Sequence, residues 1–319
     1  MCAQNSGAVS IDTNKFLSIH IHIMVNDIYK TRSCSACISA ALNIYSANFT
    51  KIFRSTWPWV LAFAIANGLS AFISMPATAK GPGIMLYAAA TLVLAAAMFA
   101  MDVRIISGVV AMLNEVALKK TAAKVMKTKV LEIAVLFVTG IAITAAIYAM
   151  ASLGFMQKMP LATAAIVMAA AAIIILLAAI LLSPFIYTAT KYLLEPEAKF
   201  KDIFGKNYLC GMRRLGFLFS TLVVIILFCF IVSLFLCIPA FITITAGKAD
   251  ELGVMSGDAS GLPAYFAWLN FVSSAIMAFI VQYMAIWMTL TAFYAYGSIE
   301  ADNAKRKEET AKKQNTNEH

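Results

Sequence analysis

The sequence predicts an all-α integral membrane protein, and three observations support that class: the composition, the apolar stretches and the placement of the cations. Hydrophobic residues make up 61% of the 319 residues and charged residues 13%, against about 45–50% and about 25% in soluble domains. The mean hydropathy is +0.82. A water-soluble fold of this size could not cover so much apolar surface with so few charges, so soluble classes are excluded.

Six apolar stretches are long enough to cross a bilayer, which takes about 20 helical residues. The predicted spans are 57–75, 83–101, 130–155, 161–186, 215–244 and 263–296. Each is expected to be a helix, because an isolated strand leaves its backbone groups unpaired in lipid. The last two exceed the required length, which indicates tilt or an extension beyond the membrane. Pro184, Pro239 and Gly140 are expected to bend their spans.

The Lys and Arg residues predict the orientation of these spans. Of the 25 cations, 22 fall on one side of the predicted spans, and only Lys80, Lys158 and Lys248 fall on the other. Because cytoplasmic loops are enriched in Lys and Arg, both termini are predicted to be cytoplasmic, in a bacterial inner membrane. The net charge of +9 then indicates contact with anionic lipid at the cytoplasmic face, and no nucleic-acid partner.

The chain divides into three parts. Residues 1–37 are predicted to be a partly disordered cytoplasmic segment, 38–301 the six-span domain, and 302–319 a disordered cytoplasmic tail rich in Lys, Glu and Asn. Residues 1–23 lack the pattern of a secretory signal peptide, and Met24 is an alternative start.

A loose threefold repeat precedes the odd-numbered spans. Residues 48–54, 121–127 and 207–213 each end in a large apolar residue followed by a cation. They predict three hairpins, each preceded by a basic amphipathic helix in the headgroup layer. The alternative is that any basic loop before a span has this appearance. The expected interfacial anchors are the indoles and cations next to the spans: Trp57, Trp59, Arg54, Lys127, Arg213 and Trp268.

Polar residues within the spans are the remaining candidates for a functional site. They are Asn67 in the first span and Asn270, Ser273, Ser274 and Gln282 in the sixth. Such amides and hydroxyls could line a substrate path, or they could bond adjacent helices together. Both interpretations stay open at this point.

Catalytic patterns are not evident in the sequence. Glu132 is the one acidic residue inside a predicted span, close enough to pair with Lys129. The pair Cys34 and Cys37, with His20 and His22, could hold zinc or act as a redox dithiol. A coincidence is favoured, because zinc ribbons need a second pair. All six cysteines are expected to be free thiols. We therefore expect no catalytic residue, cofactor or metal.

Short motifs at both ends of the membrane domain resemble a bacterial family. Asn48, Phe49, Phe53 and Arg54 precede the first span, and residues 291–300 (TAFYAYGSIE) close the sixth. Over residues 38–305 this pattern resembles the six-span membrane domain of some glycerophosphodiester phosphodiesterases and its stand-alone relatives. In that family the phosphodiester chemistry belongs to a separate soluble barrel domain, for which this chain has no room. The resemblance therefore implies a membrane module and not an esterase.

Two functions follow as expectations. The first is a non-enzymatic membrane module, a scaffold or an accessory subunit of an envelope or transport complex with a membrane-protein partner. The absence of ionisable groups deep in the predicted spans favours it. The alternative is a transporter or permease for a weakly polar or lipid-like substrate, with Asn67 and the sixth span lining the path.

Overall fold

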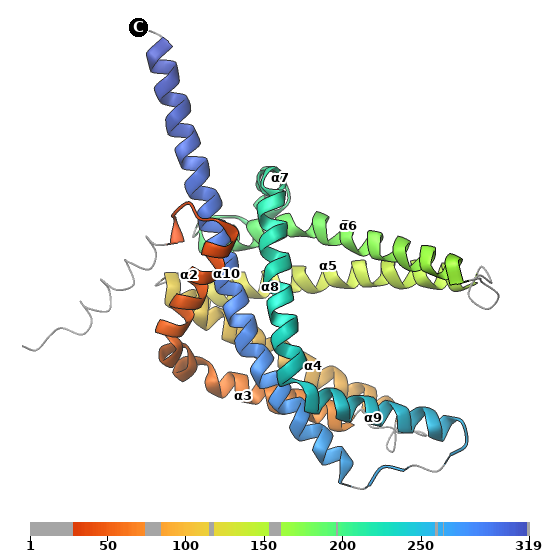
Figure 1. Cartoon of the computed structure of the whole chain (residues 1–319). Coiled ribbons are helices and arrows are strands. Elements are labelled where there is room, and N and C mark those ends of the chain that lie inside the picture. The colour runs from red at the N-terminus through yellow and green to blue at the C-terminus, as the bar shows by residue number, and fades with distance from the viewer. Residues whose placement is uncertain are drawn as a thin grey trace, which may run out of the picture.

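The computed structural model describes residues 28–73, 84–114, 118–152, 161–195, 197–258, 261–263 and 265–317, and its regular elements there are all helical, as predicted (Figure 1). The elements are α2 (Cys34–Ala47), α3 (Phe49–Ile73), α4 (Ile84–Asn114), α5 (Leu118–Ser152), α6 (Leu161–Leu194), the 3-10 helix η2 (Phe200–Ile203), α7 (Lys206–Arg213), α8 (Leu215–Leu236), α9 (Ile238–Met255) and α10 (Phe266–Asn317).

Four of these helices are long and apolar enough to cross a bilayer: Phe49–Ile73, Ala88–Leu113, Leu215–Leu236 and Phe266–Gln314. They contain most of the first, second and sixth predicted spans and the first part of the fifth. The third and fourth predicted spans fall on α5 and α6, and the turn between these helices lies outside the described residues. In Figure 1 the α5–α6 pair runs across α8 and α10.

The distribution of polar and apolar side chains is that of a membrane protein. Large apolar residues are exposed, including Leu86 at 78% and Phe235 at 73%, while Asn270 and Gln282 are buried at 4% and 5% exposure. Water would favour the reverse arrangement, whereas lipid accepts an apolar exterior and favours polar contacts between helices. The predicted class, an all-α membrane protein, agrees with this arrangement.

The predicted fifth span is two helices and not one bent helix. The structure ends α8 at Leu236 and starts α9 at Ile238, with Pro239 in the first turn of α9. Proline has no amide hydrogen and its ring clashes with the carbonyl four residues earlier, so the α8 ladder cannot continue through Pro239. In Figure 1, α9 turns away from the axis of α8.

The segment predicted as a disordered tail is helical. In the structure α10 continues to Asn317, and its last turns project beyond the other helices (Figure 1). Ala, Lys, Glu, Arg and Gln dominate this segment and are strong helix formers. Arg306 also pairs with Asp302 one turn earlier at 3.2 Å. The composition of this segment therefore indicates solvation but not disorder.

The predicted helices before each hairpin form only in part. Residues 207–213 fall in a separate α7, which precedes α8, whereas residues 49–54 are the first turns of the continuous α3. The helix before α3, α2, contains no Lys or Arg. Residues 121–127 lie within the continuous α5. Helix α2 also begins at Cys34, before the predicted domain boundary at residue 38, and residues 1–27 lie outside the described part of the chain.

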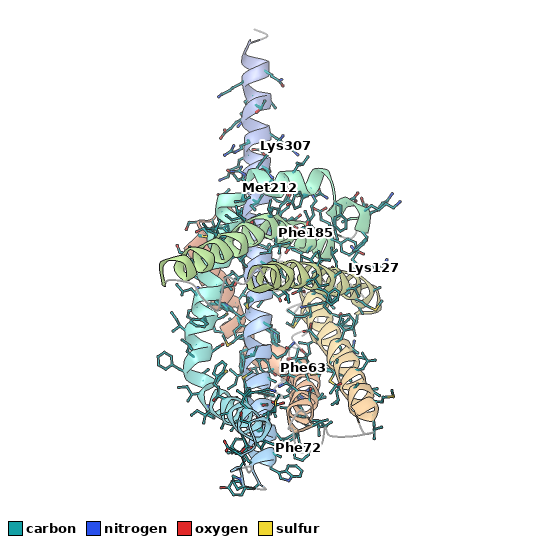
Figure 2. All side chains as sticks on the ribbon, turned by 90° about the vertical axis from the view of Figure 1, so that its right-hand side faces the viewer. Phe63, Phe72, Lys127, Phe185, Met212 and Lys307 are labelled. Carbon is teal, nitrogen blue, oxygen red and sulfur yellow. The ribbon has the colours of Figure 1, made fainter. Side chains whose placement is uncertain are left out.

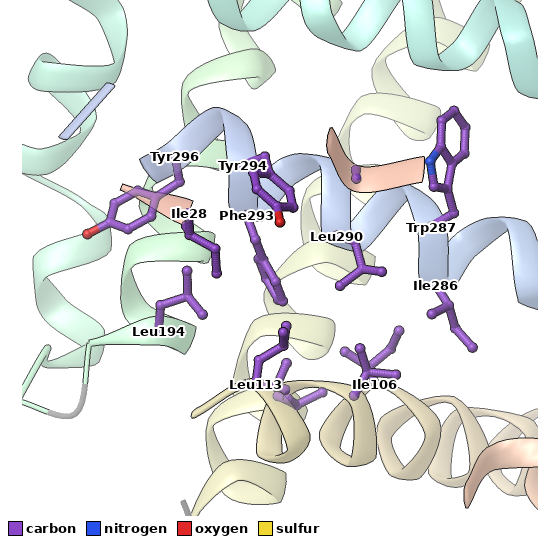
Figure 3. Packing of buried hydrophobic residues seen from close by; sticks show 14 of the residues in the cluster. Ile28, Ile106, Leu113, Leu194, Ile286, Trp287, Leu290, Phe293, Tyr294 and Tyr296 are labelled. Carbon is purple, nitrogen blue, oxygen red and sulfur yellow. The ribbon is translucent and has the colours of Figure 1, made fainter. Parts of the chain in front are cut away.

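Helix α10 forms the centre of the core, along which α3 and α2 pack. In Figure 3, Leu290 and Phe293 of α10 point toward Ile106 and Leu113 of α4. In Figure 2, Lys307 lies near the top, Lys127 at about mid-height and Phe72, near the end of α3, at the bottom.

Candidate functional site

Two of the three amides predicted as a path or a packing contact, Asn67 and Asn270, lie in a seam between α3 and α10. Asn67 Nδ2 donates to the carbonyl oxygen of Ser274 at 3.2 Å, and Asn270 Nδ2 donates to that of Ala71 at 3.0 Å. The two amides thus cross the seam in opposite directions. Each one fastens its own helix to the backbone of the other.

Gly68 allows the backbones of α3 and α10 to come this close. A Cβ at Gly68 would lie 2.8 Å from the carbonyl oxygen of Phe271, too close for any alanine to be accommodated without a shift. Small residues at such contacts let the helices approach within hydrogen-bonding distance of one another. The seam therefore combines a small residue with polar side chains.

The two serines predicted as site residues, Ser273 and Ser274, make different contacts. Ser273 Oγ lies 2.8 Å from Thr243 Oγ1, which joins α9 to α10. Ser274 is buried at 2% exposure, and its backbone carbonyl is what Asn67 contacts. Both serines are therefore part of the contact surface between α10 and its neighbours.

Gln282 belongs to a second polar group, which joins α10, α4 and α5. Its Nε2 donates to Asp102 Oδ1 at 2.7 Å, and Asp102 pairs with Lys129 at 3.2 Å. Lys129 pairs in turn with Glu132 at 3.1 Å. Burial alone would lower the pKa of Lys129, but the Asp102 and Glu132 carboxylates outweigh burial and raise it. The ammonium therefore stays charged, and we call these four residues the Lys129 group.

The predicted interfacial anchors lie at the surface. Trp57 and Trp59 are 43% and 42% exposed, and the Arg104 guanidinium lies 5.5 Å from the centre of the Trp59 ring. Trp268 is 61% exposed and packs against Phe72 at 4.9 Å between ring centres. The cations Arg54, Lys127 and Arg213 are exposed. These positions suit contact with the membrane–water interface.

A cluster of tyrosines and glutamates, which is not among the predicted site residues, joins α6 to α10. Tyr296 Oη donates to Glu195 Oε1 at 2.6 Å, and Tyr187 Oη donates to Glu300. Lys191 lies between the two carboxylates, 3.7 Å from Glu195 and 3.8 Å from Glu300. We call these five residues the Tyr–Glu cluster.

The four-residue spacing of these side chains in the sequence is the pattern that indicates the Tyr–Glu cluster. Tyr187, Lys191 and Glu195 follow one another at four-residue intervals, which places them on one face of a helix. Tyr296 and Glu300 have the same spacing in α10. Burial, the Glu300 hydrogen bond and its charge raise the pKa of Tyr187, so its hydroxyl remains a donor.

Two further cations, Arg214 and Lys124, form contacts between helices near the Tyr–Glu cluster. Arg214, between α7 and α8, pairs with Asp302 of α10. Lys124 of α5 donates to the carbonyl oxygens of Tyr192 and Glu195, at 3.1 and 2.6 Å, where α6 ends. A cation at a helix C-terminus satisfies carbonyls that lack a partner within the helix. Helices α5, α6, α8 and α10 are thus joined by charged contacts here.

A cavity of about 370 Å³ lies between α4, α5, α6, α8 and α10. Most of its lining is apolar, for example Leu182, Leu222 and Phe293, and Lys129 and Glu132 contribute charges at one wall. Its volume falls at the lower end of the range of about 300–1,000 Å³ typical of small-molecule sites. No local sequence pattern indicates this cavity, because five separate helices contribute to its lining.

No family model, curated protein or solved structure matches this chain significantly. The resemblance to the membrane domain of glycerophosphodiester phosphodiesterases therefore stays a prediction. In the structure, one of its motifs, residues 291–300, contributes Phe293, Tyr294 and Tyr296 to the core and Glu300 to the Tyr–Glu cluster.

Cys34 and Cys37, the two cysteines of the C-x-x-C pattern, contact different residues. Cys34 Sγ lies 2.7 Å from Thr221 Oγ1, and Cys37 Sγ lies 3.7 Å from the carbonyl oxygen of Tyr294. The five cysteines in the described ranges, all except Cys2, are unpaired there. Within those ranges no group of three His, Cys, Asp or Glu residues is placed to hold a metal, and His20 and His22 lie outside them.

The Cys37 thiol is expected to resist alkylation in the folded protein. Its side chain is fully buried, and burial raises its pKa to about 11. At pH 8 only about one thiol in a thousand would be the reactive thiolate. Mass spectrometry after iodoacetamide treatment should show Cys210 modified and Cys37 unmodified, with both modified in denaturant. Equal rates in the folded protein would contradict the packing of α2 against α10.

Proposed function

We propose that this protein is a non-enzymatic, six-span module of a bacterial inner membrane that serves as a scaffold or as an accessory subunit of an envelope or transport complex. One observation carries the proposal. Asn67 and Asn270 direct their amide donors at backbone carbonyls of the opposite helix across the α3–α10 seam. Side chains lining an aqueous path would instead face a water-filled space.

The charged contacts at the other end of α10 support the same function. The Tyr–Glu cluster and the Arg214–Asp302 pair tie α10 to α6 and to the start of α8. Helices joined at both ends by polar contacts form a rigid frame. Rigidity suits a module that positions a partner, whereas alternating access requires one group of helices to move against another.

The proposed topology places both termini in the cytoplasm. The uneven division of cations supports it. Helices α5 and α6 have 35 and 34 residues, and at 1.5 Å per residue each is about 50 Å long, enough to cross about 30 Å of hydrocarbon. On this topology the external segments are the α3–α4 and α5–α6 connections and the region after α9.

A second function, a carrier or permease for a weakly polar or lipid-like substrate, is favoured by the cavity. It is mostly apolar, with a pair of opposite charges at one wall. If this function holds, the cavity and not the α3–α10 seam would accept the substrate. The two functions thus assign different roles to different parts of α10.

Leucine substitutions distinguish packing from a path. Asn67→Leu and Gln282→Leu are each expected to lower stability by about 0.5–2 kcal/mol, the range measured for hydrogen bonds between membrane helices. Thermal unfolding of the purified protein in detergent gives the readout. Asn43→Leu, at an exposed position of α2, is the matched control and should leave the melting temperature unchanged. Unchanged stability of both the Asn67→Leu and the Gln282→Leu variant would argue against the packing role.

Purification in native-lipid nanodiscs tests the scaffold function itself. Mass spectrometry is expected to find a membrane protein at a fixed stoichiometry with this chain. The association should persist in Asn43→Leu, which preserves the frame. A preparation that contains a specific small molecule and no protein partner would favour the carrier function instead.

A further inference from the structure

The wall of the cavity is even less polar than its residues suggest. Three of its threonines direct their hydroxyls to carbonyls of their own helices: Thr128 to Lys124 at 3.0 Å, Thr221 to Phe217 at 2.8 Å, and Thr289 to Ala285 at 2.9 Å. A hydroxyl that donates in this way presents mainly its methyl group to the space beside it. The interior therefore favours a hydrocarbon chain.

One wall of this cavity differs, because Lys129 and Glu132 both line it. They are separated by 3.1 Å, and Glu132 is half-exposed, so this wall is open to the outside of the bundle. The cavity thus has an apolar interior and a charged, accessible edge. This arrangement matches an amphiphile, whose apolar tail would lie in the interior and whose charged head would lie at the edge.

The charges at this edge favour one kind of headgroup. An ammonium has three donors, and Lys129 directs two of them at Asp102 and Glu132, which leaves one for a phosphate oxygen. Glu132 uses Oε2 for Lys129, so its other oxygen can accept from an amine. The three side chains together carry a net charge of −1, which disfavours a purely anionic head. A zwitterion with a phosphate and an ammonium matches both signs.

We propose that this cavity binds one acyl chain of a phosphatidylethanolamine, with the lipid phosphate at Lys129 and the lipid ammonium at Glu132. A volume of about 370 Å³ suits one chain, and the second chain would remain in the bilayer. The site is separate from the anionic-lipid contact predicted at the cytoplasmic surface. It goes beyond the proposed function, because a scaffold and a carrier could both hold such a lipid.

The test uses the full chain in nanodiscs of equal parts phosphatidylethanolamine and phosphatidylglycerol, with native mass spectrometry of the lipids retained on release. The wild-type chain is expected to keep one phosphatidylethanolamine. Glu132→Gln should reduce its preference for phosphatidylethanolamine over phosphatidylglycerol about tenfold, the factor that one charge-assisted hydrogen bond is worth. Ala189→Trp, which places a large ring at the cavity wall, should abolish retention.

Glu251→Gln is the matched control. Glu251 pairs with Lys248 three residues earlier at 2.7 Å, the same spacing as Lys129 and Glu132, but in α9 and away from the cavity. The Glu251→Gln variant should retain phosphatidylethanolamine with the same preference over phosphatidylglycerol as the wild type.

Glu132 is half-exposed, so the Glu132→Gln substitution should preserve the fold. Circular dichroism checks this, and the comparison of the two Gln variants holds even if Ala189→Trp misfolds. Equal retention of the two lipids by the wild type, or identical effects of the two Gln variants, would overturn the proposal. Retention of a fatty acid or detergent in place of the phospholipid would also overturn it.

Discussion

Alanine at Gly68 is expected to destabilise the protein although it improves the helix. In an open helical position this change gains about 0.5–1 kcal/mol, because glycine loses more backbone entropy on folding. At Gly68 the new Cβ would lie 2.8 Å from the Phe271 carbonyl oxygen, so α3 and α10 must separate. Overpacking of this kind costs about 1–3 kcal/mol. The separation also lengthens the Asn67 and Asn270 hydrogen bonds.

Gly108→Ala is the matched control for this prediction. Gly108 is also helical, in α4, and a Cβ there would meet no atom within 4 Å. It should keep or raise the melting temperature, while Gly68→Ala lowers it. If both variants gained stability by the same amount, α3 and α10 could not be in close backbone contact.

Loss of the Glu300 carboxylate is expected to have the second large effect. In Glu300→Ala the Tyr187 hydroxyl, on a side chain 1% exposed, keeps only the weak sulfur acceptor of Cys210 at 3.6 Å. A buried polar group without a good partner costs about 1–3 kcal/mol. Lys191 also loses one of its two carboxylates. Thermal or denaturant unfolding in detergent measures the change.

Tyr187→Phe separates the hydrogen bond from general disruption. Glu300 is partly exposed and can be hydrated once the hydroxyl is gone, so this variant should cost only about 0.5–1.5 kcal/mol. The double variant should cost less than the sum of the singles, because phenylalanine leaves no hydroxyl to bury. Strict additivity would show that Tyr187 and Glu300 do not interact.

The features that could be predicted from the sequence are those that depend on local pattern. Long apolar runs indicated the helices α3, α4, α8 and α10, because span length and hydropathy are properties of contiguous residues. Asn67 and Asn270 could be singled out because amides are uncommon inside apolar helices. The sequence predicts either a substrate path or bonding between helices for these amides, and in the structure each amide donates to a backbone carbonyl of the opposite helix.

The rest depends on which helices meet. Asp102 contacts Gln282, 180 residues away, and Tyr187 contacts Glu300, 113 residues away. No local spacing identifies such partners, although the four-residue intervals in α6 could have indicated a functional face. Pro239 predicts a bend where the structure has a break, because a kink and a break require the same residue. The composition of residues 302–319 predicts disorder where the structure has a helix, because Lys and Glu are both charged and strong helix formers.

The number of spans is the central claim, and labelling of single cysteines tests it most directly. In a chain whose six native cysteines are replaced, one cysteine is placed at Gln157, between α5 and α6, at Ser256, after α9, or at Thr310, in the last turns of α10. An impermeant maleimide is applied to intact and to permeabilised cells. Six spans with both termini inside predict that positions 157 and 256 react in intact cells, and that position 310 reacts only after permeabilisation. Protection of position 157 until permeabilisation would contradict the account, because the α5–α6 pair would then remain on the cytoplasmic side of a four-span protein.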